Sequence, residues 1–148
     1  MGVEANKDLI RRFYEEAWAK GNVEVSHEVF HDDYVRHDLR QTPAERGPAG
    51  QAKIADDFRR AFPDVDWHVD LIIGEGDFVV GRWTATGTQT GTLGAVEPTD
   101  RRVTFSGVNI FRFDGDKVAE IWNHRDDLGL MSQLGAVVLA GAAGDQRG

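Results

Sequence analysis

The sequence predicts an α+β fold in which helices cover one face of a strongly curved, mostly antiparallel sheet. Two observations support this prediction. Apolar residues recur at helical spacing before residue 62, and from residue 67 onward they alternate with polar residues, the period-two pattern of half-buried strands. A chain that runs through its helices first and its hairpin-linked strands later is typical of the α+β class. We expect the two layers to form a cone-like α+β barrel around an internal cavity, a natural place for a small apolar ligand.

The first half of the chain has the periodicity of helices. In the helix predicted over residues 6–20, two adjacent apolar rows are made up of Leu9, Phe13 and Ala17 and of Ile10, Tyr14 and Trp18. A helix at 48–61 is indicated by Pro48, which suits a first helical turn, and by the shared face of Phe58 and Phe62. Shorter helices are predicted at residues 23–30 and 127–134.

The second half is predicted to form strands linked by hairpin turns, with Gly74-Glu75-Gly76-Asp77 as the first turn. We interpret Gly81 and Gly87 as marks of bends or bulges. The polar stretch 31–50 is expected to be a loop with a short strand near 34–37. The four main strands are predicted at residues 67–73, 78–90, 102–113 and 117–125.

Length, charge and cysteine content exclude several classes of protein. We expect a single domain over residues 1–148, with an ordered part at about 6–135 and a flexible C-terminal tail. Lys and Arg total 17 against 25 Asp and Glu, a net charge of −8, which argues against broad binding to nucleic acid and to anionic membranes. With no cysteine, disulfides, thiolate nucleophiles and zinc–thiolate sites are excluded. No signal peptide or membrane span is predicted, so we expect a soluble cytoplasmic protein.

Four stretches together resemble the SnoaL-like polyketide cyclase family, within the wider group of proteins similar to nuclear transport factor 2 and ketosteroid isomerase. They are FYEEAWAKGN at 13–22, DDYVRHD at 32–38, VVGRWTATGTQTG at 79–91 and PTDRRVTFSGVNIFRFDGDKVAEIWNHRDDLGLMSQLG at 98–135. The likeness covers roughly residues 6–135. The ending LGLMSQLG after a Trp-bearing strand is its most specific part.

The resemblance implies a cofactor-independent enzyme of polyketide or other secondary metabolism, such as antibiotic biosynthesis. Such an enzyme binds a hydrophobic aromatic polyketide-type substrate, stabilises an enolate-like intermediate and promotes aldol-type cyclisation. The same scaffold hosts several reactions, so two alternatives stay open. One is a polyketide hydroxylation component of the same family, and the other is a non-catalytic module that binds a small molecule.

Two strand residues are candidates for binding a substrate oxygen. Arg82 faces either the cavity or solvent, and a similarly placed arginine in the active site of related epoxide hydrolases favours a catalytic role. Asn123 stands at the position where the resemblance to the polyketide cyclases implies a catalytic aspartate that moves the proton. An amide is no general base, although it can orient a carbonyl. We therefore predict that Asn123 faces the cavity beside Arg82 and binds a substrate oxygen without taking a proton.

The proton-transfer role then falls to another catalytic residue. The candidates are His37, in the His37-Asp38 pair, and Asp126, which follows the last predicted strand. Adjacent strand residues point to opposite faces, so His37 and Asp38 need not touch. A third place is near the second helix, where His27 and His31 are more simply surface residues.

The aromatic residues suggest both a substrate surface and a partner surface. Trp18, Tyr14 and Phe62 are predicted to line the substrate site at the helix–sheet boundary. Trp83 and Trp122 fall on the opposite strand faces from Arg82 and Asn123, so we expect both on the outer sheet face. Two exposed tryptophans on one face predict a homodimer through the sheets.

No metal and no cofactor is predicted. The acidic and histidine residues at 31–38 lack a familiar ligand spacing, and the glycines lack a dinucleotide-binding pattern. The expected partner is therefore a small hydrophobic substrate, without nucleic acid or membrane.

Overall fold

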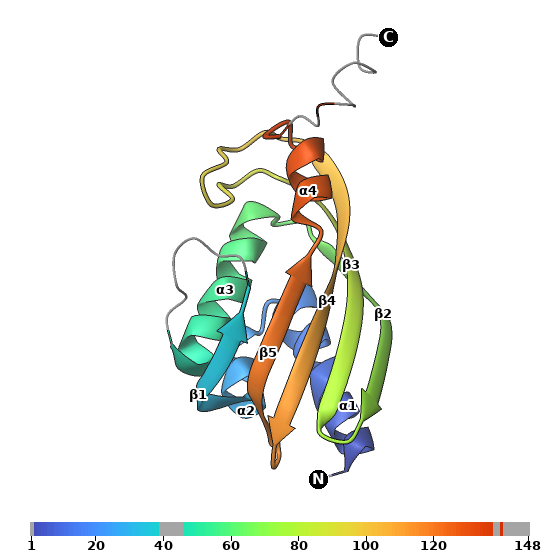
Figure 1. Ribbon diagram of the computed structural model, residues 1–148. Coiled ribbons are helices and arrows are strands. Elements are labelled where there is room, and N and C mark those ends of the chain that lie inside the picture. The colour runs from blue at the N-terminus through green and yellow to red at the C-terminus, as the bar shows by residue number, and fades with distance from the viewer. Residues whose placement is uncertain (1, 39–45, 138–139, 141–148) are drawn as a thin grey trace.

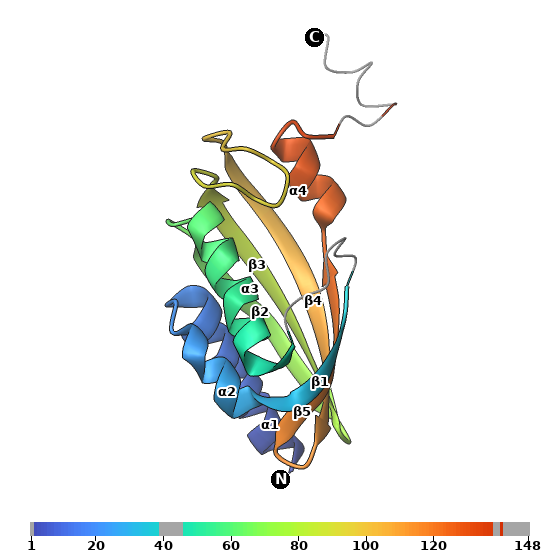
Figure 2. The ribbon, with the colours of Figure 1, turned by 90° about the vertical axis from the view of Figure 1, so that its left-hand side faces the viewer.

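The computed structural model describes residues 2–38, 46–137 and 140 (Figure 1). The helical elements are α1 (Val3–Phe13), the π-helical η1 (Tyr14–Ala19), the 3-10 turn η2 (Val23–Val25), α2 (Ser26–Val29), α3 (Gly47–Ala61) and α4 (Asp127–Gln133). The strands are β1 (Phe30–His37), β2 (Asp66–Glu75), β3 (Phe78–Thr88), β4 (Arg102–Asp114) and β5 (Lys117–Arg125). Helices α1, α2 and α3 lie on one side of a curved sheet, which confirms the predicted α+β class (Figure 2). No helix in the described residues is long and apolar enough to cross a membrane.

The five strands form one open sheet in the order β1-β5-β4-β3-β2. The pairs β2–β3, β3–β4 and β4–β5 are antiparallel, whereas β1 runs parallel to β5. Because β1 and β2 are the two edges, the sheet does not close into the expected barrel. The parallel pair brings β1, an early strand of the chain, next to β5, the last strand.

Some element boundaries differ from the predicted ones. Helix α1 begins at Val3, and Asn6 is buried within it rather than at its start. Strand β1 begins at Phe30 and is longer than the predicted strand at 34–37. Residues that were predicted to be loop belong to the strand because β1 pairs with β5 from Phe30 onward. Most of the expected flexible tail lies outside the described residues.

Alternation along β3 decides which of its side chains face the helices. Val79, Trp83 and Ala85 are buried on the inner face, and Arg82 lies on the outer face. Trp83 is only 4% exposed, so its predicted place on the outer sheet face is wrong. One reason that Trp83 fits on the inner face is Gly107 on the neighbouring strand β4, because a Cβ there would lie 2.3 Å from Cζ2 of Trp83. This glycine gives the indole room against the sheet.

The same close approach explains Gly81. A Cβ there would lie 2.4 Å from Oη of Tyr14. The pairing of β3 with β4 runs without a register shift, so Gly81 and Gly87 do not mark bulges between these strands. Gly81 instead lies where a helix side chain reaches the backbone of the sheet.

Aromatic rings fill the space between helices and sheet. Trp67 stacks on Trp18 with ring centroids 4.9 Å apart and on Trp83 with centroids 4.1 Å apart, at interplanar angles of 25° and 24°. Phe58 meets Trp67 edge to face. Phe62 packs on Phe58 and is fully buried. The core is therefore a continuous aromatic cluster that extends from η1 to the sheet.

Candidate functional site

Four polar side chains meet on the inner face of the sheet. Asn109 of β4 and Asn123 of β5 are direct cross-strand partners, and Trp83 of β3 and Tyr14 of η1 converge on them. Oδ1 of Asn109 accepts hydrogen bonds from Tyr14 Oη at 2.7 Å and from Trp83 Nε1 at 3.0 Å. Nδ2 of Asn109 donates to Oδ1 of Asn123. The two asparagine amides are thus joined in a hydrogen-bonded row that begins in the core.

The Tyr14 hydroxyl is a neutral donor in this row. The side chain is 1% exposed, and burial raises the pKa of the phenol well above its ordinary value, because the phenolate would lose its hydration. Tyr14 therefore stays protonated at neutral and at moderately alkaline pH. Its hydrogen bond to Asn109 does not depend on pH there.

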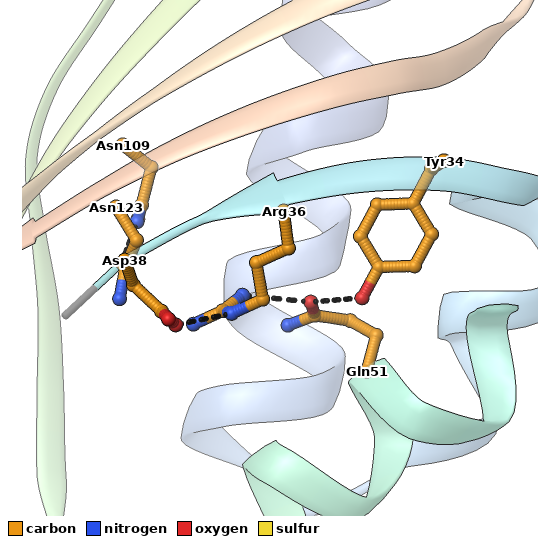
Figure 3. Close-up of polar contacts among 6 residues, drawn as sticks. All are labelled: Tyr34, Arg36, Asp38, Gln51, Asn109 and Asn123. Atoms are coloured by element: carbon orange, nitrogen blue, oxygen red, sulfur yellow. Dashed lines mark hydrogen bonds and ion pairs between the residues drawn. The ribbon is translucent and has the colours of Figure 1, made fainter. Parts of the chain in front are cut away.

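A second polar group adjoins Asn123 on the side of β1 (Figure 3). Arg36 donates from Nε to Asp38 Oδ2 at 2.6 Å and from Nη1 to Gln51 Oε1 at 2.9 Å. Tyr34 Oη donates to the same Gln51 oxygen at 3.1 Å. The parallel pairing of His37 with Trp122 sets Asp38 level with Asn123 on the neighbouring strand.

The ion pair between Arg36 and Asp38 is largely shielded from water. Only 10% of the Arg36 side chain and 11% of the Asp38 side chain are exposed, and Gln51 is 1% exposed. Charges interact more strongly where water is scarce. An amide, a carboxylate and a guanidinium in such surroundings can bind a ligand oxygen and exchange a proton with a neighbouring carbon or oxygen.

Arg82 lies outside this group. It points from the outer face of β3 and pairs with Asp70, whose Oδ2 also accepts a hydrogen bond from Thr84 Oγ1 at 2.8 Å. The Arg82 side chain is 45% exposed. The prediction that Arg82 faces the interior beside Asn123 is therefore wrong, because Trp83 and its apolar neighbours take the inner face of the strand.

The two predicted proton carriers also point away from Asn123. His37 lies on the outer face, where its Nε2 is 2.6 Å from Oε2 of Glu120 and its ring stacks on Trp122 at 5.2 Å. Asp126 lies just before α4, and its Oδ1 accepts a hydrogen bond from the backbone N–H of Gly129 at 2.9 Å. The first residue is turned outward by strand alternation, and the second caps a helix.

The three predicted substrate-contact residues take different places. Tyr14 and Phe62 are fully buried in the core, and Tyr14 belongs to the row of hydrogen bonds described above. Trp18 is partly buried and forms the outer end of the tryptophan stack. Of the three, Trp18 alone has surface available to a ligand in this conformation.

A hollow lies elsewhere on the described part of the chain. A pocket of about 550 Å³ opens beside η1, η2 and α2, with Arg12, Glu16 and Glu28 among its lining residues. It includes no residue of the polar group around Asn123, so the expected internal cavity stays a prediction. Across residues 2–38, 46–137 and 140, no three His, Asp or Glu side chains gather as a metal site would require.

Sequence patterns alone missed three residues of this site. Asn109 is the one polar side chain at the inward positions of β4 from Val103 to Phe113, which was a usable signal. Arg36 lies on the same face of β1 as Asp38, and the two-residue spacing links them. Gln51 has no such signal, because its contact with β1 depends on how α3 packs on the sheet.

Known proteins resemble this chain in both sequence and structure. The model of the SnoaL-like polyketide cyclase family matches residues 8–134. TsrD from Streptomyces laurentii is 26% identical, with a TM-score of 0.83 over 93% of this chain and 99% of that chain. AclR, a proposed hydroxylase from Streptomyces galilaeus, is 27% identical, with a TM-score of 0.79 over 93% of this chain and 89% of that chain. IdmH, a proposed polyketide cyclase from Streptomyces antibioticus, is 28% identical, with a TM-score of 0.71 over 88% of this chain and 98% of that chain.

No curated protein sequence matches this chain. The family match nevertheless extends from α1 to α4, and the fold of the solved structures agrees with it. The resemblance noted from the sequence motifs is confirmed. The chain belongs to the SnoaL-like polyketide cyclase family.

Proposed function

We propose that this chain is a cofactor-independent enzyme that binds a flat, oxygen-rich polyketide-type substrate and promotes aldol-type ring closure through an enolate. The observation that supports this function is the amide of Asn123 on β5 beside the carboxylate of Asp38, which directly follows β1 and whose side chain is only 11% exposed. Membership of the family and the likeness to IdmH, a proposed polyketide cyclase, favour the same reaction.

In the proposed reaction, Asp38 takes a proton from a carbon next to a substrate carbonyl. The electron pair of the broken C–H bond moves to the carbonyl oxygen, and the resulting enolate accepts a hydrogen bond from Nδ2 of Asn123. The enolate carbon attacks a second carbonyl of the same substrate and forms the ring C–C bond. The new alkoxide takes the proton back from Asp38, so no oxidant or reductant is consumed.

Arg36 and Gln51 have a supporting role in this proposal. The bond from Arg36 Nε holds the Asp38 carboxylate, and Gln51 holds the guanidinium from the other side. A base whose position is set by a second residue loses less entropy on reaction. The proton-transfer role thus moves from His37 to the neighbouring Asp38, which the alternation of β1 turns inward.

The test follows exchange of the α-hydrogens of 2-tetralone, a flat aromatic ketone, for deuterium by NMR. We expect the wild type to accelerate exchange and Asp38→Asn to slow it by roughly a hundred- to ten-thousandfold, the range for loss of a general base. Asp70→Asn is the matched control, because it removes a carboxylate that pairs with an arginine on the outer face. Equal rates for wild type and Asp38→Asn would exclude Asp38 as the base.

A second candidate function is a hydroxylation component acting on a polyketide. The likeness to AclR, a proposed hydroxylase, and the amide at Asn123 favour it. Incubation of a reduced naphthohydroquinone with ¹⁸O₂ discriminates the two, since only hydroxylation places ¹⁸O in the product. Saturable binding of both probes without any reaction would instead indicate a non-catalytic binding module.

We also infer that the chain forms a homodimer through the outer sheet face. Leu71, Ile73 and Phe78 are 45%, 57% and 43% exposed, and Trp122 lies on the same face. Exposed apolar residues that gather on one face are typical of an interaction surface. A cytoplasmic location and a place in antibiotic or other secondary metabolism stay predictions from the sequence.

A further inference from the structure

Trp83 differs from the other partners of Asn109 because it can only donate a hydrogen bond. An indole N–H has no acceptor atom, whereas the Tyr14 hydroxyl both donates and accepts, and an asparagine amide does either according to its orientation. Trp83 Nε1 is buried and lies 3.0 Å from Oδ1 of Asn109. If the Asn109 amide turned over, two buried donors would face each other and both would lack a partner, which is costly.

The orientation of Asn109 determines that of Asn123. With Oδ1 of Asn109 engaged by two donors, its Nδ2 points toward β5, where it needs an acceptor. Asn123 supplies Oδ1, and its own Nδ2 therefore points away from Asn109. Figure 3 shows Asp38 and its ion-pair partner Arg36 on the side of Asn123 that faces away from Asn109.

We propose that Trp83 is a positioning residue, which acts through Asn109 to hold Asn123 with its N–H groups turned toward the substrate. The site would then select a ligand oxygen that accepts, such as a ketone, enolate or phenolate oxygen, over a ligand group that only donates. This inference rests on the proposed function, because it specifies how the same site recognises the substrate oxygen.

The packing around Trp83 makes it a rigid reference for the two amides. Its ring stacks on Trp67 at 4.1 Å, and the backbone at Gly107 lies so close that a Cβ would be 2.3 Å from the indole. A ring held between a stacked neighbour and the sheet cannot turn without displacing other core side chains. The direction of its N–H group is therefore fixed before any ligand binds.

Trp83→Phe and Tyr14→Phe form a matched pair of variants. Each removes one hydrogen bond to Oδ1 of Asn109 and leaves an aromatic ring behind. Without the Tyr14 hydroxyl, the indole still fixes the amide. Without the indole N–H, the Tyr14 hydroxyl can accept from Asn109 as readily as donate, so both asparagines are free to turn over. A purely structural role gives no reason for this difference.

The ligand probe is alizarin, a flat hydroxyanthraquinone whose absorbance reports ionisation of its phenol. We expect the wild type and Tyr14→Phe to bind the phenolate about tenfold more tightly than the phenol, because a charged acceptor strengthens the hydrogen bond from Asn123. Trp83→Phe is expected to lose most of this preference. Equal behaviour of the two variants would overturn the proposal.

NMR of the ligand-free wild type tests the orientation without any variant. We expect a weak cross-peak between the indole Hε1 of Trp83 and the side-chain amide protons of Asn109, and a strong one would show the reversed amide and overturn the proposal. Failure of alizarin to bind the wild type would count against the proposed aromatic substrate class. The NMR result would still decide the role of Trp83.

Discussion

Gly107→Ala is expected to displace Trp83 and destabilise the protein. The new methyl carbon would lie 2.3 Å from Cζ2 and 2.7 Å from Cε2 of the indole. Carbon atoms in contact prefer about 3.5–4.0 Å, so the ring has to move by more than about 1 Å. Trp67 stacks on it at 4.1 Å and Phe105 meets it edge-on at 5.9 Å, so the movement strains the core.

The size of the effect follows from three contributions. Overpacking of a well-packed core costs about 1–3 kcal/mol. Lengthening the hydrogen bond from Trp83 Nε1 to Asn109 costs about 1 kcal/mol more. Loss of glycine freedom in the unfolded chain offsets about 0.4–1 kcal/mol. The expected net loss is about 2–3 kcal/mol, or roughly 4–12 °C in Tm for a chain of this size.

Urea unfolding followed by tryptophan fluorescence and circular dichroism measures this loss. Gly87→Ala is the matched control, because Gly87 is buried on the inner face of β3 and its Cβ would meet Phe62 and Asp64 at 3.2 Å and 3.3 Å only. We expect this control to stay within about 1 kcal/mol of wild type. A Gly107→Ala protein as stable as the Gly87→Ala protein would refute the argument that the indole is held against the sheet.

Three further predictions concern the site and the outer face. Asn123→Ala should slow 2-tetralone exchange by roughly ten- to a thousandfold, as loss of one oxyanion donor does, while Arg82→Gln on the outer face leaves the rate unchanged; an unaffected Asn123→Ala rate would contradict the site. Hydrogen bonds from His37, the larger cause, and from Arg112 lower the pKa of Glu120. The Glu120 carboxylate therefore stabilises the fold at neutral pH, and this stabilisation is lost as the pH falls through the lowered pKa. Urea unfolding should therefore show Glu120→Gln less stable than wild type at about pH 7 and the difference narrowing toward about pH 3, and a constant difference would exclude this linkage. Phe78→Glu should convert the expected dimer to the single-chain mass in sedimentation, and a wild type that already sediments as one chain would contradict the interface.

The order of helices and strands could be predicted because it depends on local periodicity. Local periodicity could not predict which row of side chains on β3 faces the helices. Val80, Thr84 and Thr86 on one row and Val79, Trp83 and Ala85 on the other are both suited to a buried face of a strand, so the pattern leaves two choices. Packing decides between them, because only the row with Gly81 lets a large ring from η1 reach the backbone.

The inward position of Asn123 could be predicted from family resemblance, whereas its partners could not. Tyr14 and Asn109 are 95 residues apart in the chain, and Arg36 and Gln51 belong to different elements. Such contacts depend on strand register and helix packing, which local residue patterns do not encode. His37 and Asp38 show how fine the dependence is, since one step along β1 exchanges the outer face for the inner one.

The parallel pairing of β1 with β5 has a consequence for synthesis of the protein. The two strands are separated by about eighty residues, as the 83-residue interval between His37 and Glu120 shows. Strand β1 therefore emerges from the ribosome long before β5, its partner strand in the described sheet. Until β5 is made, Asp38 has no Asn123 beside it, and β1 has no strand with which to pair. Contacts of such long range close late and slowly. A nascent chain that stops before residue 117 therefore carries α1, α2, α3 and the antiparallel strands β2 to β4, together with Asp38, but it lacks Asn123 and α4.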